Sequence, residues 1–570
     1  MFDALRSHSL RTPSGRPPRA TPRGAVLPAL VLAAALGASW GAPRAAGAQV
    51  VLGAGDDATL PARGEVRVRV SPGFNAASSR LGGPSGTGGD RVPIGSEFST
   101  DALGPTQFPT LGPVRDTLRA ITGRPALDLS LGTVRVAART SVTSVPTLVE
   151  FGLARRLAVA VTIPGVITRT SVGVDVNANG GAGNFGINPL LGSATQGAAA
   201  ARNAAALQNL DTAITRLRAR GATALAADAE RFRNGLAAVY GTGASSAGAY
   251  AVPLAGSDAQ AAVAARLAQL AQLGAPLDPS RTPAPSLARV GTAEFLDLLT
   301  DPAFGIGGGV VAPLGSYNRS GPGDIDAVVN LNLVDTFGGR GRDGVLRARV
   351  APARGVRLRA TVGAGYRLGI SAAPVPFLLF DLPPGERSSA LLGRAAADVA
   401  VGRRFSTSVV ARLASPVSGR LTLRVADAGN PYSPAYRVRE VERTLGRELQ
   451  LEVTPRYALN DAFALFAQAL VRDRAADAYT GTFTATADET GAGEVAFDAS
   501  TLGTGTGGRE TRAGFGVAYS TLAGYARGKG RVPVELSYQH SVLAAASGGR
   551  VLNTTSELLS VRVAARLFGR

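Results

Sequence analysis

The chain has 570 residues, a formal net charge of +19 and no cysteine. Without cysteine it can form neither disulfide bonds nor a thiolate metal site. Nearly all of its basic residues are Arg, which is typical of a GC-rich genome, and no basic helix carries interleaved aromatic residues. The positive charge therefore does not indicate nucleic-acid binding.

The first 48 residues have the organisation of a secretory signal peptide. Several Arg residues precede an apolar stretch that contains Pro28, and Ala46-Gly47-Ala48 forms a small-x-small cleavage site before Gln49. An uncleaved membrane anchor is the alternative, and the small-residue site disfavours it. We expect cleavage after Ala48. Since no later run reaches about 18 apolar residues, we expect no transmembrane helix in the mature chain.

Apolar and polar residues alternate over much of the remaining chain, as in β-strands. From Val356 to Gly369, for example, Val, Leu, Ala and Tyr occupy one set of alternate positions and Arg, Thr and Gly the other. The pattern predicts about twelve strands, near residues 64–74, 140–153, 157–172, 324–335, 356–370, 390–402, 405–415, 447–459, 462–473, 510–523, 531–545 and 551–568. Residues 127–139 either extend the second strand or add another.

Strand length and loop length favour a membrane barrel over a secreted β-sandwich. The expected strands have about 10 to 14 residues, against about 5 to 6 in most globular sheets, and their connections alternate between short and long. Outer-membrane barrels combine short periplasmic turns with long outer loops, and their even strand number leaves both chain ends in the periplasm. We therefore predict an all-β, transmembrane, antiparallel up-and-down β-barrel of about 12 strands with a large helical extracellular insert.

Aromatic residues near the short connections predict a ring of side chains at the periplasmic interface. The tight turn at Arg155-Arg156 is one of these connections. The residues concerned are Phe151, Phe337, Phe405, Tyr457 and Phe463.

Three phrases, taken in order, resemble the outer-membrane transporter-like barrels often labelled meta-pathway phenol-degradation proteins. They are VEFGLARRLAVAVTIP (149–164), GPGDIDAVVNLNLVDTF (321–337) and RATVGAGYRLG (359–369). Phe151-Gly152-Leu153, Arg156-Leu157, Pro164 and Gly323-Asp324 match the family pattern, whereas Ala154-Arg155 replaces its Thr-Asp. The C-terminus departs too, because Phe568 is out of phase with the outward residues and Leu567 takes its place. The resemblance covers residues 140–570 in arrangement, and implies an outer-membrane barrel that takes up small apolar molecules and has no catalytic residues.

About 150 residues between the third and fourth strands are too many for a plain loop. Three stretches are helical in pattern: 204–221, 257–274 with a capping box from Ser257 to Gln260, and 292–302 capped by Thr292. The insert could be a lid, a plug or a packed surface domain. The expected division is a signal peptide (1–48), the first barrel strands with a long outer loop (49–176), the extracellular, partly helical insert (177–323) and the remaining barrel strands (324–570).

Neither a metal site nor an active site is predicted. Asp175, Asn177 and Asn179 have the opening spacing of a calcium loop, but the twelfth position is Gly186 in place of the bidentate Glu. His540 is the one His left after signal removal, and its neighbours Ser537 and Ser541 do not by adjacency form a nucleophile–base pair. We expect no enzyme and no cofactor.

The polar face of the strands would line the barrel, either as an ion-pair network that fills it or as a channel lining that selects solutes by charge. The candidate lining residues are Arg67, Arg69, Asp326, Asn330, Asn332, Arg357, Arg359, Arg367, Arg394, Asp398, Glu448, Glu452, Glu535, Arg562 and Arg566.

These features predict a porin-like transport protein of a Gram-negative bacterium, located in the outer membrane and exported with a cleaved signal peptide. Its function would be passive uptake of small hydrophobic or anionic solutes. The alternative is a surface-binding or adhesin protein whose barrel is only an anchor. The expected partners are outer-membrane lipid and lipopolysaccharide, the barrel-assembly machinery and a small-molecule solute, without nucleic acid.

Overall fold

The structure is a computed structural model that describes residues 56–566, apart from 82–90, 179, 242–249, 302–305, 307–311, 338–354, 428, 491–492, 527–531 and 549–550. The expected signal peptide at 1–48, the cleavage site before Gln49 and the C-terminal residues Leu567 and Phe568 lie outside these described residues.

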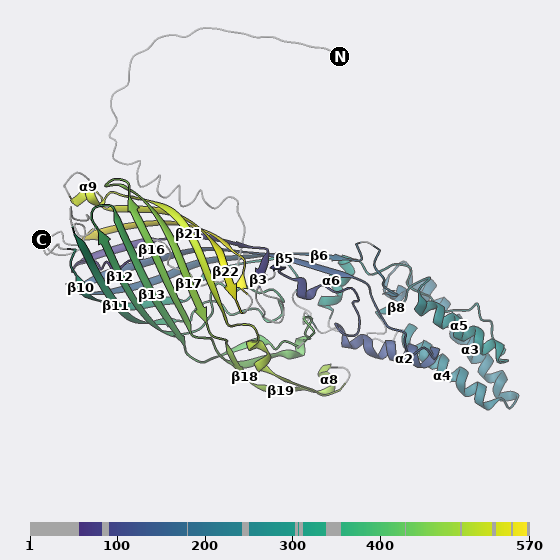
Figure 1. Ribbon diagram of the computed structural model, residues 1–570. Helices are drawn as coiled ribbons and strands as arrows, with labels where there is room; N and C mark the ends of the chain where they lie inside the picture. The colour runs from purple at the N-terminus through teal and green to yellow at the C-terminus, as the bar shows by residue number, and fades with distance from the viewer. Residues whose placement is uncertain are drawn as a thin grey trace, which may run out of the picture. The chain divides into compact units, whose positions relative to one another are not determined.

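The main sheet is a closed antiparallel barrel (Figure 1). Its strands are β1 (Glu65–Val70), β2 (Gly73–Ala77), β5 (Val134–Ala154), β6 (Leu157–Val176), β9 (Tyr317–Pro322), β10 (Ile325–Asp335), β11 (Val356–Leu368), β12 (Ala390–Val401), β13 (Phe405–Pro416), β16 (Glu448–Ala458), β17 (Phe463–Arg474), β21 (Gly508–Ser520), β22 (Val534–Ser547) and β24 (Thr555–Arg566). β1 and β2 share one position between β24 and β5, and β9 and β10 share one beside β6. The 14 strands of the sheet therefore fill twelve positions, and the ring closes because β24 pairs with β1.

The twelve expected strands are confirmed, with ends that differ by a few residues. Residues 134–139 extend β5, so they do not add a strand. Arg155 and Arg156 form the tight turn between β5 and β6. This turn marks one end of the barrel, which we call the short-turn end; the opposite end, where β5 and β6 reach beyond their neighbours, is the long-loop end.

The outer face of the barrel is apolar. Leu331, Leu358 and Leu451 leave 40–44% of their surface exposed, whereas the alternate residues Arg359 and Glu452 are buried inside. A continuous apolar belt of this kind is rare on soluble proteins and fits a lipid environment, as in a transmembrane barrel. Separately, no helix among the described residues is long and apolar enough to cross a membrane.

Aromatic side chains gather on the outer face at the short-turn end, as expected. Phe405 lies opposite Tyr457, and the ring of Phe463 lies 5.1 Å from that of Tyr519. Phe337 is the exception, since it is buried and its ring lies 4.6 Å from the guanidinium carbon of Arg359.

The cause of the exception is a β-bulge in β10 between Asn332 and Val334. A shift of one residue exchanges the two faces of a strand. The prediction of an outward Phe337 was therefore wrong.

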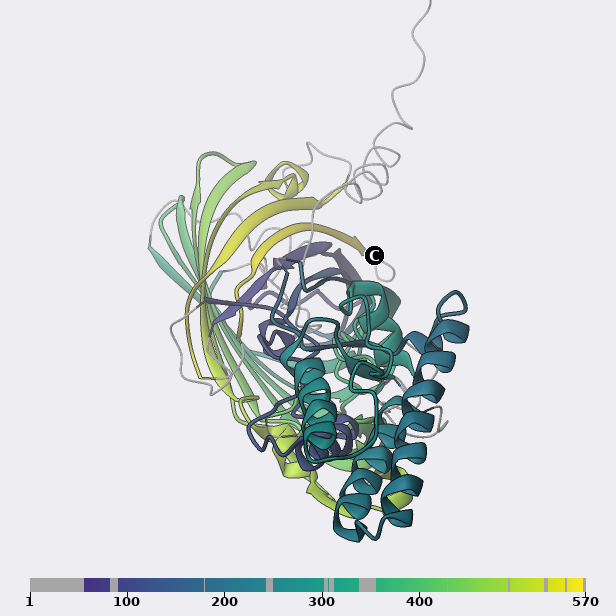
Figure 2. The ribbon, with the colours of Figure 1, turned by 90° about the vertical axis from the view of Figure 1, so that its right-hand side faces the viewer.

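At the long-loop end the connections form a body that we call the cap. Its helices are α2 (Gly112–Thr122), α3 (Gln196–Ala219), α4 (Thr223–Tyr240), α5 (Asp258–Gln272) and α6 (Thr292–Thr300). α3 and α4 pack side by side (Figure 2).

Among the described residues, four small antiparallel sheets lie in the loops that connect the barrel strands. They are β3 (Ser79–Leu81) with β4 (Arg91–Pro93) and β23 (Val551–Leu552), β7 (Phe185–Ile187) with β8 (Ala251–Pro253), β14 (Gly419–Arg424) with β15 (Val438–Thr444) and β18 (Ala478–Thr480), and β19 (Thr482–Ala485) with β20 (Val495–Asp498). Two further short helices are α8 (Ala487–Thr490) and, at the short-turn end, α9 (Leu522–Ala526).

The three expected helices are present as α3, α5 and α6, whereas α2 and α4 were not predicted. Ser257 caps α5 as expected, since its hydroxyl accepts a hydrogen bond from the Gln260 N–H at 3.2 Å. The predicted cap of α6 was wrong by one residue. Gly291 occupies the N-cap, and its N–H donates to the Glu294 carboxylate at 3.0 Å.

The insert has a packed hydrophobic core, which it shares with other loops. Phe295 of α6 packs against Tyr432, which belongs to the connection between β14 and β15. Tyr432 also contacts Phe98 and Phe108 of the loop before β5. Three connections that are distant in the chain are thus held in one core.

Candidate functional site

The predicted lining residues lie on the inner face of the barrel wherever their side chains are described; the side chain of Arg566 is not among them. Nine are buried: Arg67, Arg69, Asn330, Asn332, Arg359, Asp398, Glu448, Glu452 and Arg562. The other five also engage inner-face groups: Arg367 pairs with Asp326 at 2.7 Å, Glu535 with Arg562 at 3.2 Å, Arg394 with Asp56 at 2.8 Å, and Arg357 donates to the carbonyl of Phe337.

Much of the inner face is tied together by ion pairs between neighbouring strands. Arg412 contacts Glu452 at 2.8 Å, and Arg472 contacts Glu448 at 2.6 Å. Arg412 and Arg472 were not among the predicted residues, although both follow the inward phase of β13 and β17. The neighbouring strand β16 supplies both carboxylates. Strand alternation combined with the register of the paired strands would therefore have identified Arg412 and Arg472.

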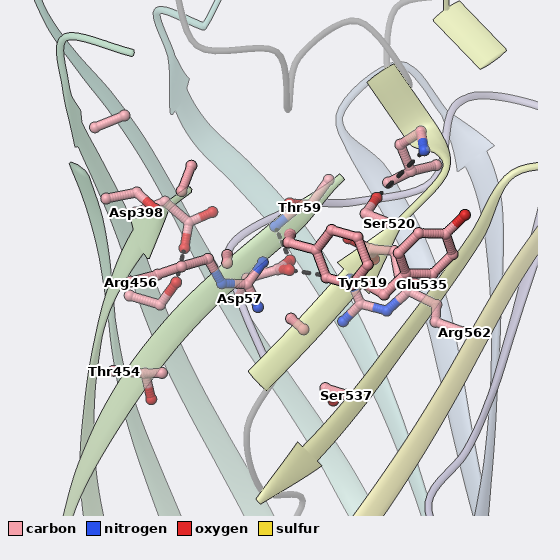
Figure 3. Close-up of a pocket in the computed structure, with 18 of the residues that line it drawn as sticks. Asp57, Thr59, Asp398, Thr454, Arg456, Tyr519, Ser520, Glu535, Ser537 and Arg562 are labelled. Atoms are coloured by element: carbon pink, nitrogen blue, oxygen red, sulfur yellow. Dashed lines mark hydrogen bonds and ion pairs between the residues drawn. The ribbon is translucent and has the colours of Figure 1, made fainter. Parts of the chain in front are cut away.

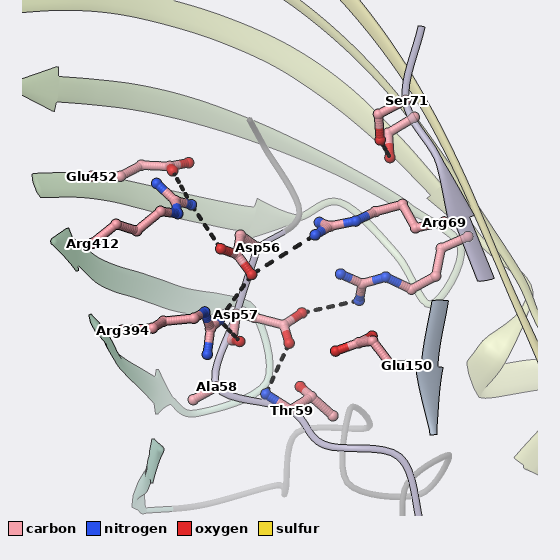
Figure 4. A network of polar contacts seen from close by, with 12 residues as sticks. Asp56, Asp57, Ala58, Thr59, Arg69, Ser71, Glu150, Arg394, Arg412 and Glu452 are labelled. Atoms are coloured by element: carbon pink, nitrogen blue, oxygen red, sulfur yellow. Dashed lines mark hydrogen bonds and ion pairs between the residues drawn. The ribbon is translucent and has the colours of Figure 1, made fainter. Parts of the chain in front are cut away.

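A segment that sequence reasoning missed lies inside the barrel. Residues 56–62, which we call the lumen segment, precede β1. The carboxylate of Asp56 lies among three guanidinium groups, at 2.8, 2.7 and 3.8 Å, which belong to Arg394, Arg412 and Arg69 (Figure 4). Arg394 and Arg412 lie opposite one another on the neighbouring strands β12 and β13, whereas Arg69 belongs to β1, which pairs with neither, so the segment connects two separate parts of the wall.

The next residues of the lumen segment continue the polar contacts. Asp57 pairs with Arg562 at 3.0 Å, and the Ala58 N–H donates to the Asp398 carboxylate at 3.1 Å. The Thr59 hydroxyl accepts from Arg359 at 2.9 Å. No residue of the segment belongs to a strand. Besides these polar contacts, Ala58 packs against Ala396 and Val410, and the Glu65 N–H at the start of β1 donates to the Ala62 carbonyl. It can therefore leave the wall without breaking a strand ladder.

Gly152 in β5 allows the lumen segment to enter at the short-turn end. The Gly64 N–H donates to the Gly152 carbonyl at 2.9 Å. A Cβ atom on Gly152 would lie 1.9 Å from the Ala62 carbonyl oxygen, which is closer than atoms can approach. A side chain at this position would push the segment away from the wall.

Replacing Gly152 with Ala is expected to loosen the lumen segment while the barrel stays folded. The clash and the weakened hydrogen bond should cost about 1–3 kcal/mol. Hydrogen exchange should show faster exchange of the Ala58 and Gly64 amides. Gly165→Ala is the matched control, since a Cβ at Gly165 meets nothing closer than 3.9 Å. Equal exchange in the two variants would contradict the role of Gly152.

Beside the lumen segment lies a cavity of about 460 Å³ (Figure 3). Asp57 and Arg562 point toward one another at its wall. The lining also includes Arg403, in the turn between β12 and β13, and Phe405, the first residue of β13, so the cavity lies toward the short-turn end. It combines charged groups with the ring of Phe337, which is buried on the inner face.

In the calcium-loop candidate formed by Asp175, Asn177 and Asn179, the side chain of Asn177 makes hydrogen bonds within the fold. The Asn177 side chain accepts from the Thr133 N–H and donates to the carbonyls of Leu131 and Val290, each at 2.9 Å. Asn179 lies outside the described residues. Within the described part of the chain, no group of three or more His, Cys, Asp or Glu side chains could hold a metal ion.

His540 and its serine neighbours lie on opposite faces of the barrel wall. The imidazole pairs with Glu557 at 2.6 Å on the outer face, where Tyr538 also contacts Glu557. Ser541 is buried on the inner face, as alternation requires. His540 therefore does not contact Ser541 as a general base.

No protein-family model and no curated protein sequence matches the chain. Among solved structures it is similar to the COG4313 outer membrane channel from Pseudomonas putida F1, with a TM-score of 0.36 and 9% identity over 90% of this chain and 100% of that one. A Pseudomonas aeruginosa FadL homologue has a TM-score of 0.23 and 10% identity over 88% and 90% of the two chains. The Ralstonia pickettii toluene transporter TbuX has a TM-score of 0.23 and 8% identity over 89% and 90%.

The first of these structures is described as an outer membrane channel and the third as a toluene transporter. Because all three TM-scores lie below 0.5, they carry no argument about solute or mechanism.

Proposed function

We propose that the protein is a passive channel of the bacterial outer membrane, which small solutes cross through the barrel when the lumen segment leaves its place. The carrying observation is the position of residues 56–62 inside a closed barrel, held by side-chain contacts and outside every strand ladder. When the segment leaves, its hydrogen bonds exchange for hydrogen bonds to water, so each contact that is lost costs about 0.5–3 kcal/mol, with the larger values for charged groups. The segment can thus act as a plug while the wall remains intact.

The barrel wall supports this proposal. Twelve strands enclose a space between that of the filled eight-stranded barrels and that of open porins of 16 or more strands. The inner face is polar, which suits solutes that carry their hydration with them. The apolar outer belt and the aromatic ring at the short-turn end fit insertion into an outer membrane, with that end toward the periplasm.

Liposome swelling tests the function of the intact protein. We expect liposomes that contain the folded protein to admit a small neutral sugar such as arabinose, and to exclude a trisaccharide such as raffinose, because a twelve-stranded barrel encloses less space than an open porin. Protein unfolded by heat before reconstitution is the control. Swelling that does not differ from this control, or does not depend on sugar size, would contradict the proposal.

A surface-binding protein is the second candidate, and the packed core of the cap favours it. Phe295, Tyr432 and their neighbours hold three loops in one body, which is more structure than a simple channel mouth needs. In this case the cap would bind a partner and the barrel would anchor it. Binding of the intact protein to cells or matrix, lost when residues 196–272 are deleted, would support this candidate.

A further inference from the structure

The position of Asp56 is a carboxylate-binding site that the barrel wall builds. The Asp56 side chain keeps 10% of its surface exposed, and two of the three guanidinium groups around it approach within hydrogen-bonding distance, Arg412 at 2.7 Å and Arg394 at 2.8 Å. Arg69 lies at 3.8 Å. The three cations belong to regular strands of the wall, whereas the carboxylate belongs to a segment outside the strands (Figure 4). The site can therefore persist when its present occupant leaves.

Asp56 is the carboxylate in closest contact with two of these arginines. Within the described residues, Asp56 is the carboxylate that pairs with Arg69 and with Arg394 at 4.0 Å or less. The other contacts of Arg394 are the Thr361 hydroxyl at 3.4 Å and the Asp57 carbonyl at 2.7 Å. Arg412 keeps Glu452 at 2.8 Å when Asp56 is absent.

Withdrawal of the lumen segment therefore leaves buried positive charge. Arg69 retains only 3% of its surface exposed in the closed barrel. A buried charge without a partner is strongly unfavourable. The two arginines would be stabilised by any anion that reproduces the contacts of Asp56, and the planar guanidinium group matches a carboxylate in a two-point contact.

The neighbouring cavity favours an organic anion. Arg69 lines the cavity of about 460 Å³ together with Phe337 and Ala400, which are buried and pack against one another. A molecule whose carboxylate takes the place of Asp56 would find room there for an apolar body of a few carbon atoms or one ring. Inorganic phosphate would fill the charged site and leave the apolar part of the cavity without contacts.

We propose that Arg69, Arg394 and Arg412 form a binding site for the carboxylate group of a small organic acid, which competes with Asp56 for the same three side chains. The inference rests on the proposed function, because the lumen segment must leave before an acid can bind. It adds the class of solute to that function and gives Asp56 the role of a tethered competitor.

Calorimetry in detergent with benzoate tests this site. Asp56→Asn keeps the shape of the side chain and removes its charge, so we expect the variant to bind benzoate about tenfold more tightly than the intact protein. Benzyl alcohol, the neutral analogue, should not bind, and Asp56→Asn/Arg394→Gln should lose benzoate binding. Equal affinity of the intact protein and Asp56→Asn, or equal binding of benzyl alcohol or inorganic phosphate, would overturn the proposal.

A second variant, with residues 49–59 deleted, vacates the same site and serves if Asp56→Asn does not fold, as judged by heat-modifiable migration. Calorimetry needs no flux, so the two proposals can fail separately. Benzoate binding in a chain that passes no solute would support the site and contradict the channel. A chain that conducts and shows no benzoate binding in either variant would support the channel and overturn the site.

Discussion

Deletion of residues 49–59 is expected to raise the conductance of the protein in planar bilayers. The deleted residues include Asp56, Asp57, Ala58 and Thr59, whose side-chain and backbone groups make the ion pairs and hydrogen bonds to the inner wall. The strands themselves are untouched, since β1 begins at Glu65. Intact protein should show brief openings, and the deletion variant should stay open.

The size of the effect follows from the contacts that are lost. Hydrogen bonds to charged groups each contribute about 1.5–3 kcal/mol, and about 1.4 kcal/mol corresponds to a tenfold change in a closed-to-open ratio. Loss of even two such contacts should raise the mean current by about tenfold or more. The deletion also removes two carboxylates from among Arg69, Arg394 and Arg562. The open channel should therefore prefer anions, as the reversal potential in a KCl gradient would show.

The matched control is a chain that lacks only residues 49–55. It keeps Asp56 and all the contacts described above, so its conductance should remain that of the intact protein. Equal currents from both deletion variants would show that the lumen segment does not close the barrel. A preference for cations in the longer deletion would show that the wall arginines do not face the path of the ions.

Sequence alternation was sufficient to predict the barrel because the same physical rule applies at every strand. From Val356 to Leu368 the apolar side chains all face outward and Arg357, Arg359 and Arg367 all face inward. Each strand repeats this division, so errors at strand ends do not change the ring. The short turn at Arg155-Arg156 then follows from strand length alone.

The lumen segment could not be predicted in this way, since its contacts have no period. Asp56 meets Arg394 and Arg412, which are 338 and 356 residues away in the chain. Such ion pairs depend on which strands surround the segment inside the barrel. The alternation of apolar and polar residues does not define this arrangement. The visible signal was the pair Asp56-Asp57 shortly after the expected cleavage site, where a mature chain begins.

Local irregularities account for the smaller errors. The extra residue of the bulge at Asn332/Val334 reverses the phase and turns Phe337 inward. At α6 the Glu294 side chain caps the helix through the Gly291 N–H, so Thr292 is free to accept a hydrogen bond from the Val176 N–H at 3.2 Å. α4 was missed because much of its buried face consists of small residues such as Ala226, Ala229 and Gly235, which give little contrast with its exposed face.

Replacing Tyr432 with Ala is expected to destabilise the cap by about 3–5 kcal/mol, the usual cost of truncating a large buried ring. Tyr432 is fully buried, and burial raises the pKa of its hydroxyl. That hydroxyl donates to the Phe98 carbonyl at 2.5 Å, while the ring contacts those of Phe108 and Phe295. The three loops that meet at this ring would lose their common contact.

Hydrogen exchange of α2 and α6 measures this effect. A loss of about 3–5 kcal/mol should speed exchange of their slowest amides by roughly 10²–10³-fold or more, if those amides exchange by opening of the cap. Tyr432→Phe is the matched control, since it removes only the hydroxyl and should cost about 0.5–1.5 kcal/mol. Both variants should keep the heat-modifiable migration of the barrel. The aromatic rings that contact Tyr432 belong to Phe98, Phe108 and Phe295, and these residues lie outside the barrel strands. Similar exchange rates in the two variants would show that the Tyr432 hydroxyl, and not its ring, holds the loops together. Loss of heat-modifiable migration would show that the cap and the barrel unfold as one unit.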